Sequence, residues 1–305
     1  SLLYLFQAMG QFCQQEVSVY VVTSRLLQVA DDEQIAWSRG SLTGLIKTVN
    51  QEYPEIRVAL LDISESPTAQ DLRLLEDEIS GKVIDTEVVI GGGVRKIALL
   101  ERFDFSQQAA VPESFHPQGT YLITGGLGGI AFQVASFLLE TCQAHLILVD
   151  RVPTSELSAE KRELLEAFDH MPGEVEYLVA DICNINEMSR AVATGLKVHE
   201  SDTLDGIVHL ASMNREALIA DETEKSFLDM LRPKVIGTWV LQQLLSDYPD
   251  ARFISYSSVN GYFGGARVSA YSAANSFLDT FVHHQVALGQ SACALAWSMW
   301  DSIGI

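Results

Sequence analysis

A tyrosine, a serine and a lysine lie at sequence spacings that suit proton transfer to a carbonyl oxygen. Tyr271 opens the segment Tyr-Ser-Ala-Ala-Asn, which ends at Asn275, and it follows Ser258 by 13 residues and Lys234 by 37 residues. When hydride reduces a carbonyl carbon, negative charge develops on the oxygen, and a phenol can donate the neutralising proton. An ordinary phenol has a pKa near 10, and a neighbouring ammonium lowers it. We predict Tyr271 as the acid, assisted by Ser258, Lys234 and Asn275.

Each of these residues also has a purely structural interpretation. Tyr271 could pack against its neighbours, and Ser258 could cap a helix. Lys234 follows Pro233 and could be a solvated residue at the start of a helix. The combination, rather than any single residue, indicates catalysis.

A glycine loop follows the apolar run Tyr121–Ile123 and precedes a segment of helical periodicity. Gly126, Gly128 and Ala131 fit the dinucleotide pattern G-x-G-x-x-A, in which a pyrophosphate binds at a helix N-terminus. A ligand-free turn is the alternative. The predicted cofactor contacts in the loop are Thr124, Gly125, Gly126, Leu127, Gly128, Gly129 and Ile130.

Residues that close the next two strands bear on the choice of cofactor. Asp150 could accept hydrogen bonds from the ribose 2′-hydroxyl of NAD, whereas Arg151 favours the 2′-phosphate of NADP. Asp181, followed by Ile182, could receive the adenine amino group, or could instead cap a helix. These residues alone therefore leave both NADPH and NADH as candidate cofactors.

The second half of the chain alternates short apolar runs with helical segments. The runs are Tyr121–Ile123, Leu146–Val149, Glu176–Ala180, Gly206–Leu210, Arg252–Tyr256 and Ala292–Ala296. Such runs indicate parallel strands covered by helices on both faces, so we predict an α/β fold with a doubly wound parallel sheet. Ligands bind at the carboxyl ends of strands in these sheets, where the glycine loop and Ser258 lie.

The first half carries a smaller α/β pattern. Strand-like runs occupy residues 17–23, 57–62 and 87–90, with helical periodicity over 42–49 and 71–79. Gly91–Gly93 precede Val94–Leu100 without a following helix, which predicts a hairpin rather than a second cofactor loop. We expect a linker near residues 109–118.

Composition excludes several classes of protein. The formal net charge is −20, which argues against binding nucleic acid or an anionic membrane surface. We find no membrane span and no signal peptide, and the four cysteines have no zinc-site spacing, so we expect a cytoplasmic protein without a metal. The first residues resemble the middle of a helix, which suggests that the sequence was cut from a longer polypeptide.

At Tyr271 and Lys234 the sequence resembles the short-chain dehydrogenase/reductase superfamily, and specifically the ketoreductase domains of modular polyketide synthases. Asn275 stands where most of the superfamily has Lys, and Lys234 stands where Asn is usual, an exchange similar to that of polyketide ketoreductases. The segment Tyr256–Gly261 is also similar to their signature. The resemblance implies a Rossmann catalytic subdomain that uses NADPH.

The first half resembles the truncated, cofactor-free structural subdomain of these proteins, at Val21–Ser24, Trp37 with Gly44, and Gln51–Pro54. We therefore predict a structural subdomain at residues 1–116 and a catalytic subdomain at 117–305. The resemblance implies reduction of a β-ketoacyl thioester on the phosphopantetheine arm of an acyl carrier protein, beside neighbouring synthase domains. The resemblance also covers ketoreductase domains of hybrid peptide–polyketide assembly lines.

Departures from the family pattern define the open alternatives. Ala211 and Ser212 are expected beside the cofactor, where Ser212 replaces the usual Gly. Met213 and Phe263 are expected in the substrate pocket. The absence of a Leu-Asp-Asp motif after Ser212 favours an L-hydroxy product. The chain ends where the family continues with a lid helix and a final strand. The alternatives are an α-ketoacyl reductase of a peptide synthetase, an inactive scaffold, and a free-standing reductase of small metabolites.

Overall fold

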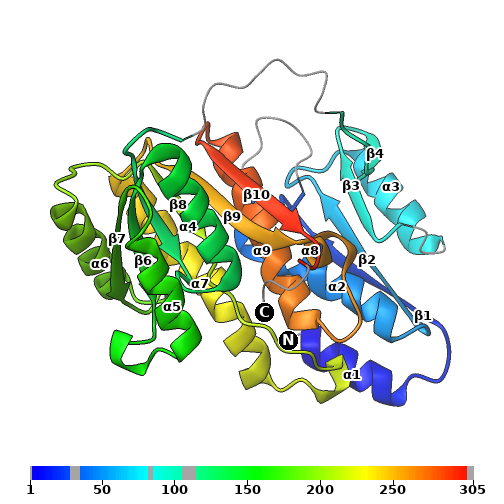
Figure 1. Cartoon of the computed structure of the whole chain (residues 1–305). Coiled ribbons are helices and arrows are strands. Elements are labelled where there is room, and N and C mark those ends of the chain that lie inside the picture. Colours follow the sequence, from blue (N-terminus) through cyan, green and yellow to red (C-terminus); the bar gives the residue numbers. More distant parts are fainter. Residues whose placement is uncertain (1, 28–34, 82–84, 105–114, 301–305) are drawn as a thin grey trace. The chain divides into compact units, whose positions relative to one another are not determined.

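A computed structural model describes residues 2–27, 35–81, 85–104 and 115–300 (Figure 1). The chain divides into two compact units, each built from three segments. The first unit comprises Ser1–Glu101, Asn214–Leu231 and Ser257–Gly289, and the second comprises Arg102–Met213, Arg232–Tyr256 and Gln290–Ile305. Each unit is described by itself below.

The first unit contains a four-stranded sheet in the order β1-β2-β3-β4. The strands are β1 (Val17–Thr23), β2 (Ile56–Ile63), β3 (Glu87–Gly91) and β4 (Val94–Ile97). The first three run parallel, and β4 pairs antiparallel with β3. Gly92 and Gly93 form the turn with φ of 61° and 75°, values that favour glycine, so the predicted hairpin is confirmed. Its second strand ends at Ile97 rather than at Leu100.

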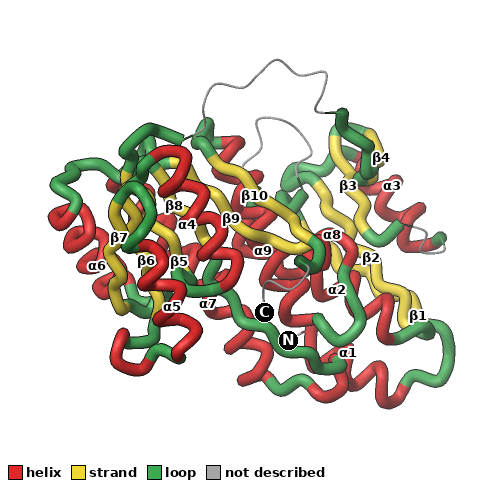
Figure 2. Tube along the Cα trace, viewed as in Figure 1, coloured by secondary structure: helices red, strands yellow, loops and turns green. Residues whose placement is uncertain are grey.

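The helices of the first unit pack against this sheet and against one another. They are α1 (Leu2–Phe12), α2 (Ser41–Glu52), α3 (Ala69–Ser80), α8 (Val259–Phe263) and α9 (Ser269–Ala287), with short 3₁₀ turns at Trp37–Arg39 and Ile219–Asp221. Figures 1 and 2 show α2 and α9 side by side, in agreement with the many close approaches between them. Their apolar faces meet the core of this unit, where Ala273 of α9 packs with Leu45 and Ile46 of α2.

The second unit contains a six-stranded sheet in the order β10-β9-β8-β5-β6-β7. Its strands are β5 (Thr120–Thr124), β6 (His145–Asp150), β7 (Glu174–Val179), β8 (Gly206–His209), β9 (Arg252–Ser258) and β10 (Ala292–Trp297). Strand β5 pairs in parallel with β6 on one side and β8 on the other. The strand order therefore reverses at β5, and ligands of open α/β sheets bind beside such a switch point. All six predicted strands and the doubly wound parallel arrangement are confirmed.

The connecting helices of the second unit are α4 (Gly129–Cys142), α5 (Ala159–Phe168) and α6 (Ile185–Val198), with a 3₁₀ turn at Thr154–Glu156. Helix α7 (Glu224–Asp247) continues from the first unit into the second. In Figure 1, α4 crosses in front of the strands of this sheet, and its buried residues Ala131, Ala135, Leu138 and Leu139 pack in the unit's core. No helix in the described ranges is both long and apolar enough to cross a membrane.

The predicted boundary between residues 116 and 117 stays a prediction. The change of sheet does fall between β4 and β5, while α8 and α9 group with the first unit. Most of the expected linker, residues 109–114, lies outside the described residues, as does Asp301 near the end of the chain.

Candidate active site

The glycine loop forms a tight connection between β5 and α4. Gly125 has φ of 73°, and a Cβ atom there would lie 3.0 Å from the backbone of Ala211. A Cβ atom at Gly126 would lie 2.8 Å from the Leu148 side chain on β6. Only glycine fits at these two positions, so the loop backbone reaches both neighbouring strands.

The N-terminus of α4 is open to a ligand. Gly128 is its N-cap, and among the described residues no side chain makes a capping hydrogen bond there. The first N–H groups of a helix have no partner within the helix and carry partial positive charge. Leu127 is buried beneath the loop, while Gly129 is exposed and Ile130 is half-buried. A diphosphate group fits this loop, because close-packed glycines are combined with free helix N–H donors.

A hydroxyl network ties the glycine loop to the loop after β8. The Thr124 Oγ1 accepts hydrogen bonds from the N–H groups of Leu210 (3.2 Å) and Ala211 (3.3 Å). It lies 2.8 Å from Nδ1 of the fully buried His209. Because Thr124 has one proton left to donate, His209 accepts it at Nδ1 and carries its own proton on Nε2. Thr124 thus links the two predicted cofactor loops. The sequence did not indicate that His209 takes part in this network.

The acidic residue at the end of β6 is already engaged. Asp150 accepts a hydrogen bond from the backbone N–H of Arg151 (2.6 Å), and its other oxygen lies 3.7 Å from Nζ of Lys161. The Arg151 side chain is exposed and makes no ion pair or hydrogen bond with any other described residue. Two cationic side chains therefore accompany one carboxylate at this strand end.

The remaining predicted cofactor residues lie after β7 and β8. Asp181 accepts from the Cys183 N–H (2.9 Å), and the N-cap of α6 is Asn184, so the alternative that Asp181 caps this helix is wrong. Ile182 is buried. Ser212 is half-buried and donates to the carbonyl of Met213 (3.3 Å).

Lys234 is buried within α7 and is not a solvated helix-start residue. The residue is only 3% exposed, and its Nζ donates a hydrogen bond to the carbonyl oxygen of Tyr256 on β9 (2.7 Å). Pro233 lies inside the same helix. An ammonium held in a buried site interacts more strongly with nearby charge than it would in water.

Ser258, Tyr271 and Asn275 lie in the first unit, at the end of β9 and the start of α9. Ser258 is the N-cap of α8, and its Oγ accepts from the Asn260 N–H (3.2 Å). The Asn275 Nδ2 donates to the Tyr271 carbonyl (2.8 Å), which confirms that these two residues share a helix face. Ser257 donates to the Asn275 carbonyl (3.4 Å), so the end of β9 meets this helix.

Two polar groups in this set lack protein partners. The Asn275 Oδ1 is buried without a hydrogen-bond partner, and such a group costs free energy unless a ligand or water satisfies it. Tyr271 is half-buried, and its hydroxyl bonds to no other described residue. Phe263, at the end of α8, is 55% exposed. These features suit a site that receives a ligand with hydrogen-bonding groups.

Helix α2 packs closely against α9, the helix that carries Tyr271. The sequence alone did not reveal this contact. A Cβ atom at Gly44 would lie 2.2 Å from the Ser272 carbonyl oxygen. The Gly44 N–H donates to Ser276 Oγ (3.1 Å), which itself donates to the Gly40 carbonyl (2.9 Å). Trp37 packs its ring against Phe277 and Phe281 of α9.

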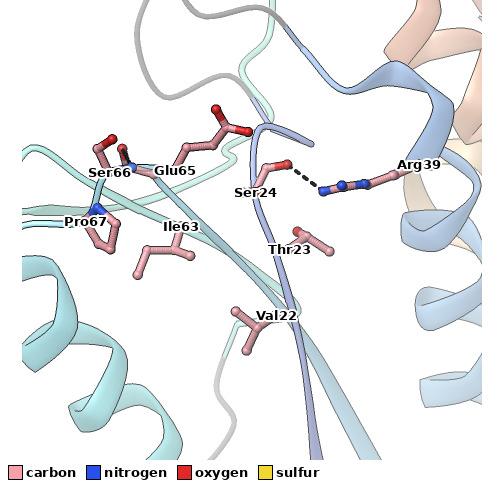
Figure 3. A pocket seen from close by; sticks show the side chains of 9 residues that line it. Val22, Thr23, Ser24, Arg39, Ile63, Glu65, Ser66 and Pro67 are labelled. Atoms are coloured by element: carbon pink, nitrogen blue, oxygen red, sulfur yellow. Dashed lines mark hydrogen bonds between the residues drawn. The ribbon is translucent and has the colours of Figure 1, made fainter.

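A hollow of about 650 Å³ lies at the carboxyl ends of β1 and β2, lined by Thr23, Ser24, Arg39, Ile63 and Glu65 among others (Figure 3). Figure 3 shows Arg39 donating to the Ser24 carbonyl, a bond of 3.1 Å.

This hollow occupies the position of a cofactor crevice without its phosphate loop. No glycine occurs between Thr23 and Trp37 in the sequence. The buried Asp62 carboxylate accepts hydrogen bonds from the Thr23 hydroxyl (2.7 Å) and the Leu27 N–H (2.8 Å). The Asp62 carboxylate thereby engages a backbone donor of the turn after β1.

Comparison with known proteins identifies similar domains. The family model of the KR domain matches residues 119–302. Phthioceranic/hydroxyphthioceranic acid synthase of Mycobacterium tuberculosis (strain ATCC 25618 / H37Rv) is 37% identical over 195 residues, which cover 62% of this chain and 9% of that protein. Mellein synthase of Phaeosphaeria nodorum (strain SN15 / ATCC MYA-4574 / FGSC 10173) is 27% identical over 286 residues, 88% of this chain and 16% of that protein. The chain thus spans a small part of these relatives.

Solved structures agree over nearly the whole chain. One contains the adenylation, ketoreductase and pseudo Asub domains of a keto acid-selecting NRPS module; it is 31% identical with a TM-score of 0.90, and the match covers 98% of this chain and 25% of that one. A ketoreductase domain from the bacillaene assembly line is 25% identical with a TM-score of 0.84, over 99% of this chain and 71% of that one.

Proposed function

Because the chain belongs to the KR domain family, the ketoreductases of polyketide and peptide assembly lines, we propose that it reduces the keto group of a β-ketoacyl thioester to a hydroxyl group with NADPH. The thioester is carried by an acyl carrier protein. The observation that carries this proposal is the Tyr271 hydroxyl, which bonds to no other described residue and lies at the start of a braced helix.

The cofactor is assigned to the second unit. The glycine loop and the N-terminus of α4 hold the diphosphate, Arg151 receives a 2′-phosphate, and Asp181 receives the adenine amino group. Engagement of Asp150 by the Arg151 N–H and Lys161 weakens its repulsion of a phosphate, which favours NADPH while leaving NADH as an alternative. When bound, the cofactor supplies the hydride that reaches the carbonyl carbon.

The chain's own residues handle the oxygen of the substrate. Ser258 Oγ accepts from the Asn260 N–H and keeps its own proton, which it donates to the carbonyl oxygen. Tyr271 transfers its proton to the same oxygen as negative charge develops there. The buried ammonium of Lys234 stabilises the tyrosinate that this transfer leaves. The orphaned Asn275 Oδ1 takes a donor from the bound ligands or an ordered water.

Substitution of Tyr271 by Phe tests the proposal. We expect reduction of a ketoacyl thioester to fall by about 10²–10⁴-fold, because only the proton donor is lost. Binding of NADPH, followed by fluorescence, should be unchanged. Tyr262→Phe on α8 is the matched control and should keep full turnover. Reduction at the wild-type rate by Tyr271→Phe would refute the assignment.

A second candidate function is reduction of an α-ketoacyl group in a peptide synthetase. The similarity to the ketoreductase-containing structure of a keto acid-selecting NRPS module favours it. Turnover of matched α- and β-ketoacyl thioesters, with chiral analysis of both alcohols, separates the two candidates and tests the expected L-configuration. A higher kcat/KM for the α-keto substrate would replace the first proposal with the second.

The same reasoning assigns different roles to the two parts of the chain. We assign residues 1–116 to a cofactor-free structural subdomain, since no glycine occurs between Thr23 and Trp37 after β1, and residues 117–305 to catalysis. An acyl carrier protein and neighbouring synthase domains are the partners. An inactive scaffold is the less favoured alternative, because Ser258, Tyr271, Asn275 and Lys234 are all present.

A further inference from the structure

Three side chains that the proposed reaction does not use converge at the amino ends of two strands of the second sheet. His145 is the first residue of β6 and pairs in register with Glu174, the first residue of β7. His199 caps the C-terminus of α6. One ligand atom from each of the three lies within 4.8 Å of the others. From this geometry we infer that His145, Glu174 and His199 form a zinc-binding site.

The separations between the ligand atoms fit a common metal ion. Glu174 Oε2 lies 3.3 Å from His145 Nδ1 and 3.1 Å from His199 Nδ1. Zinc binds nitrogen and oxygen at about 2.0–2.2 Å, so neighbouring ligand atoms around a tetrahedral zinc ion lie roughly 3.3–3.6 Å apart, close to the two observed separations. Water would supply the fourth ligand, as it does in open three-residue zinc sites.

Hydrogen bonding within the cluster is incomplete without a cation. His199 Nδ1 faces the Glu174 carboxylate, and its Nε2 lies 3.3 Å from the Leu146 carbonyl oxygen. Both partners can only accept, and a neutral imidazole has one proton to donate, so one of these two contacts is left without a proton in a side chain only 1% exposed. His145 Nδ1 is buried and makes no well-aligned hydrogen bond in the described structure, although Glu174 Oε2 lies 3.3 Å away.

A zinc ion removes both difficulties. With Nδ1 of each imidazole on the metal, the His199 Nε2 proton is donated to the Leu146 carbonyl, the usual outer-shell arrangement for a metal-bound histidine. Two imidazoles and one carboxylate favour zinc over Ca²⁺ and Mg²⁺, which prefer oxygen ligands throughout.

The position of the cluster separates it from the proposed chemistry. His145 opens β6 and Asp150 closes it, so the two strand ends lie roughly 17 Å apart at about 3.3 Å per residue. The metal would therefore hold β6, β7 and the end of α6 together and would not contact the cofactor loop. The site is independent of the proposed function.

Zinc titration of the EDTA-treated, tag-free chain tests the inference by calorimetry and thermal unfolding. We expect binding of one zinc ion, an increase in melting temperature, and no comparable effect of Ca²⁺ at equal concentration. Glu174→Gln alters a side chain that is 60% exposed and should fold normally, and His145→Gln is a second variant. Loss of one ligand should weaken zinc binding at least about 100-fold, the upper end of the loss seen for outer-shell changes.

His116→Gln is the matched control, because His116 also pairs with a carboxylate (Asp205, 2.7 Å) but no second imidazole joins that pair in the described structure. It should bind zinc as the wild type does. The inference is overturned if the wild type binds no zinc, if Ca²⁺ binds equally well, or if both ligand variants retain wild-type affinity.

Discussion

Acidification should destabilise the fold through one buried histidine, His209 at the end of β8. Its ring is fully buried, and Nδ1 accepts the proton of the Thr124 hydroxyl, as derived above. Burial, together with the positive charge of Lys234, lowers the pKa of His209 to about 3, while a hydrogen bond to the Pro233 carbonyl opposes the shift. The folded chain therefore keeps this histidine neutral throughout the range in which an unfolded histidine gains a proton.

The direction and size of the effect follow from proton binding. An unfolded histidine has a pKa of about 6.5, so below that pH the unfolded chain binds a proton that the folded chain does not. Stability therefore falls as pH falls, with a limiting slope of about 1.4 kcal/mol per pH unit between the two pKa values. Between pH 7.5 and pH 5 the contribution of His209 to the free energy of unfolding should decrease by about 2 kcal/mol.

Urea unfolding of the wild type and of His209→Asn at several pH values between 5 and 7.5 isolates this contribution. Asparagine keeps a polar atom near Thr124 but does not titrate, so the variant carries a constant loss of packing and lacks the pH-dependent term. The stability gap between the two proteins should narrow by about 2 kcal/mol on going to pH 5. His170→Asn, at an exposed site, is the control and should follow the wild-type profile. Parallel profiles for wild type and His209→Asn would show that this histidine is not held neutral.

Three further predictions test the site and its support. Gly44→Val should lower the free energy of unfolding in urea by about 1–3 kcal/mol, because the valine Cβ would lie 2.2 Å from the Ser272 carbonyl oxygen. A stability equal to that of the wild type would contradict the close packing of α2 on α9. Asp150→Ser should increase the preference for NADPH over NADH by about tenfold in equilibrium binding, equivalent to about 1.4 kcal/mol; equal preferences would show that Arg151 alone decides. Lys234→Met should move the pH–rate profile of reduction to higher pH by about one unit or more, since the buried ammonium is lost; a stationary profile argues against its role.

The parts of the fold that follow from local patterns were predictable from the sequence. Short apolar runs located all six strands of the second sheet, and the glycines at 91–93 indicated a turn because no helical periodicity follows them. The glycine loop was recognisable because tight packing demands glycine at Gly125 and Gly126, as their close approaches show. Tyr271 and Asn275 were correctly placed on one helix face because four residues make about one turn.

Features that depend on contacts between distant segments were not predictable in this way. His209 reads as an ordinary residue in an apolar run, and only the register of β5 with β8 brings it to Thr124. His145 and Glu174 meet because β6 and β7 pair from their first residues. Asp181 had two reasonable roles in the sequence, and the capping geometry of Asn184 removed one of them.

The first half of the chain supplies contacts that support helix α9. Its helix α2 approaches α9 so closely that glycine is required at Gly44, and Ser276 bridges the two helices through hydrogen bonds. Trp37 adds aromatic contacts further along α9. A helix that presents a proton donor must hold that group within a fraction of an ångström, because reactivity falls steeply with misplacement. In the first unit, α2 therefore supplies a rigid support for the proton donor proposed at Tyr271.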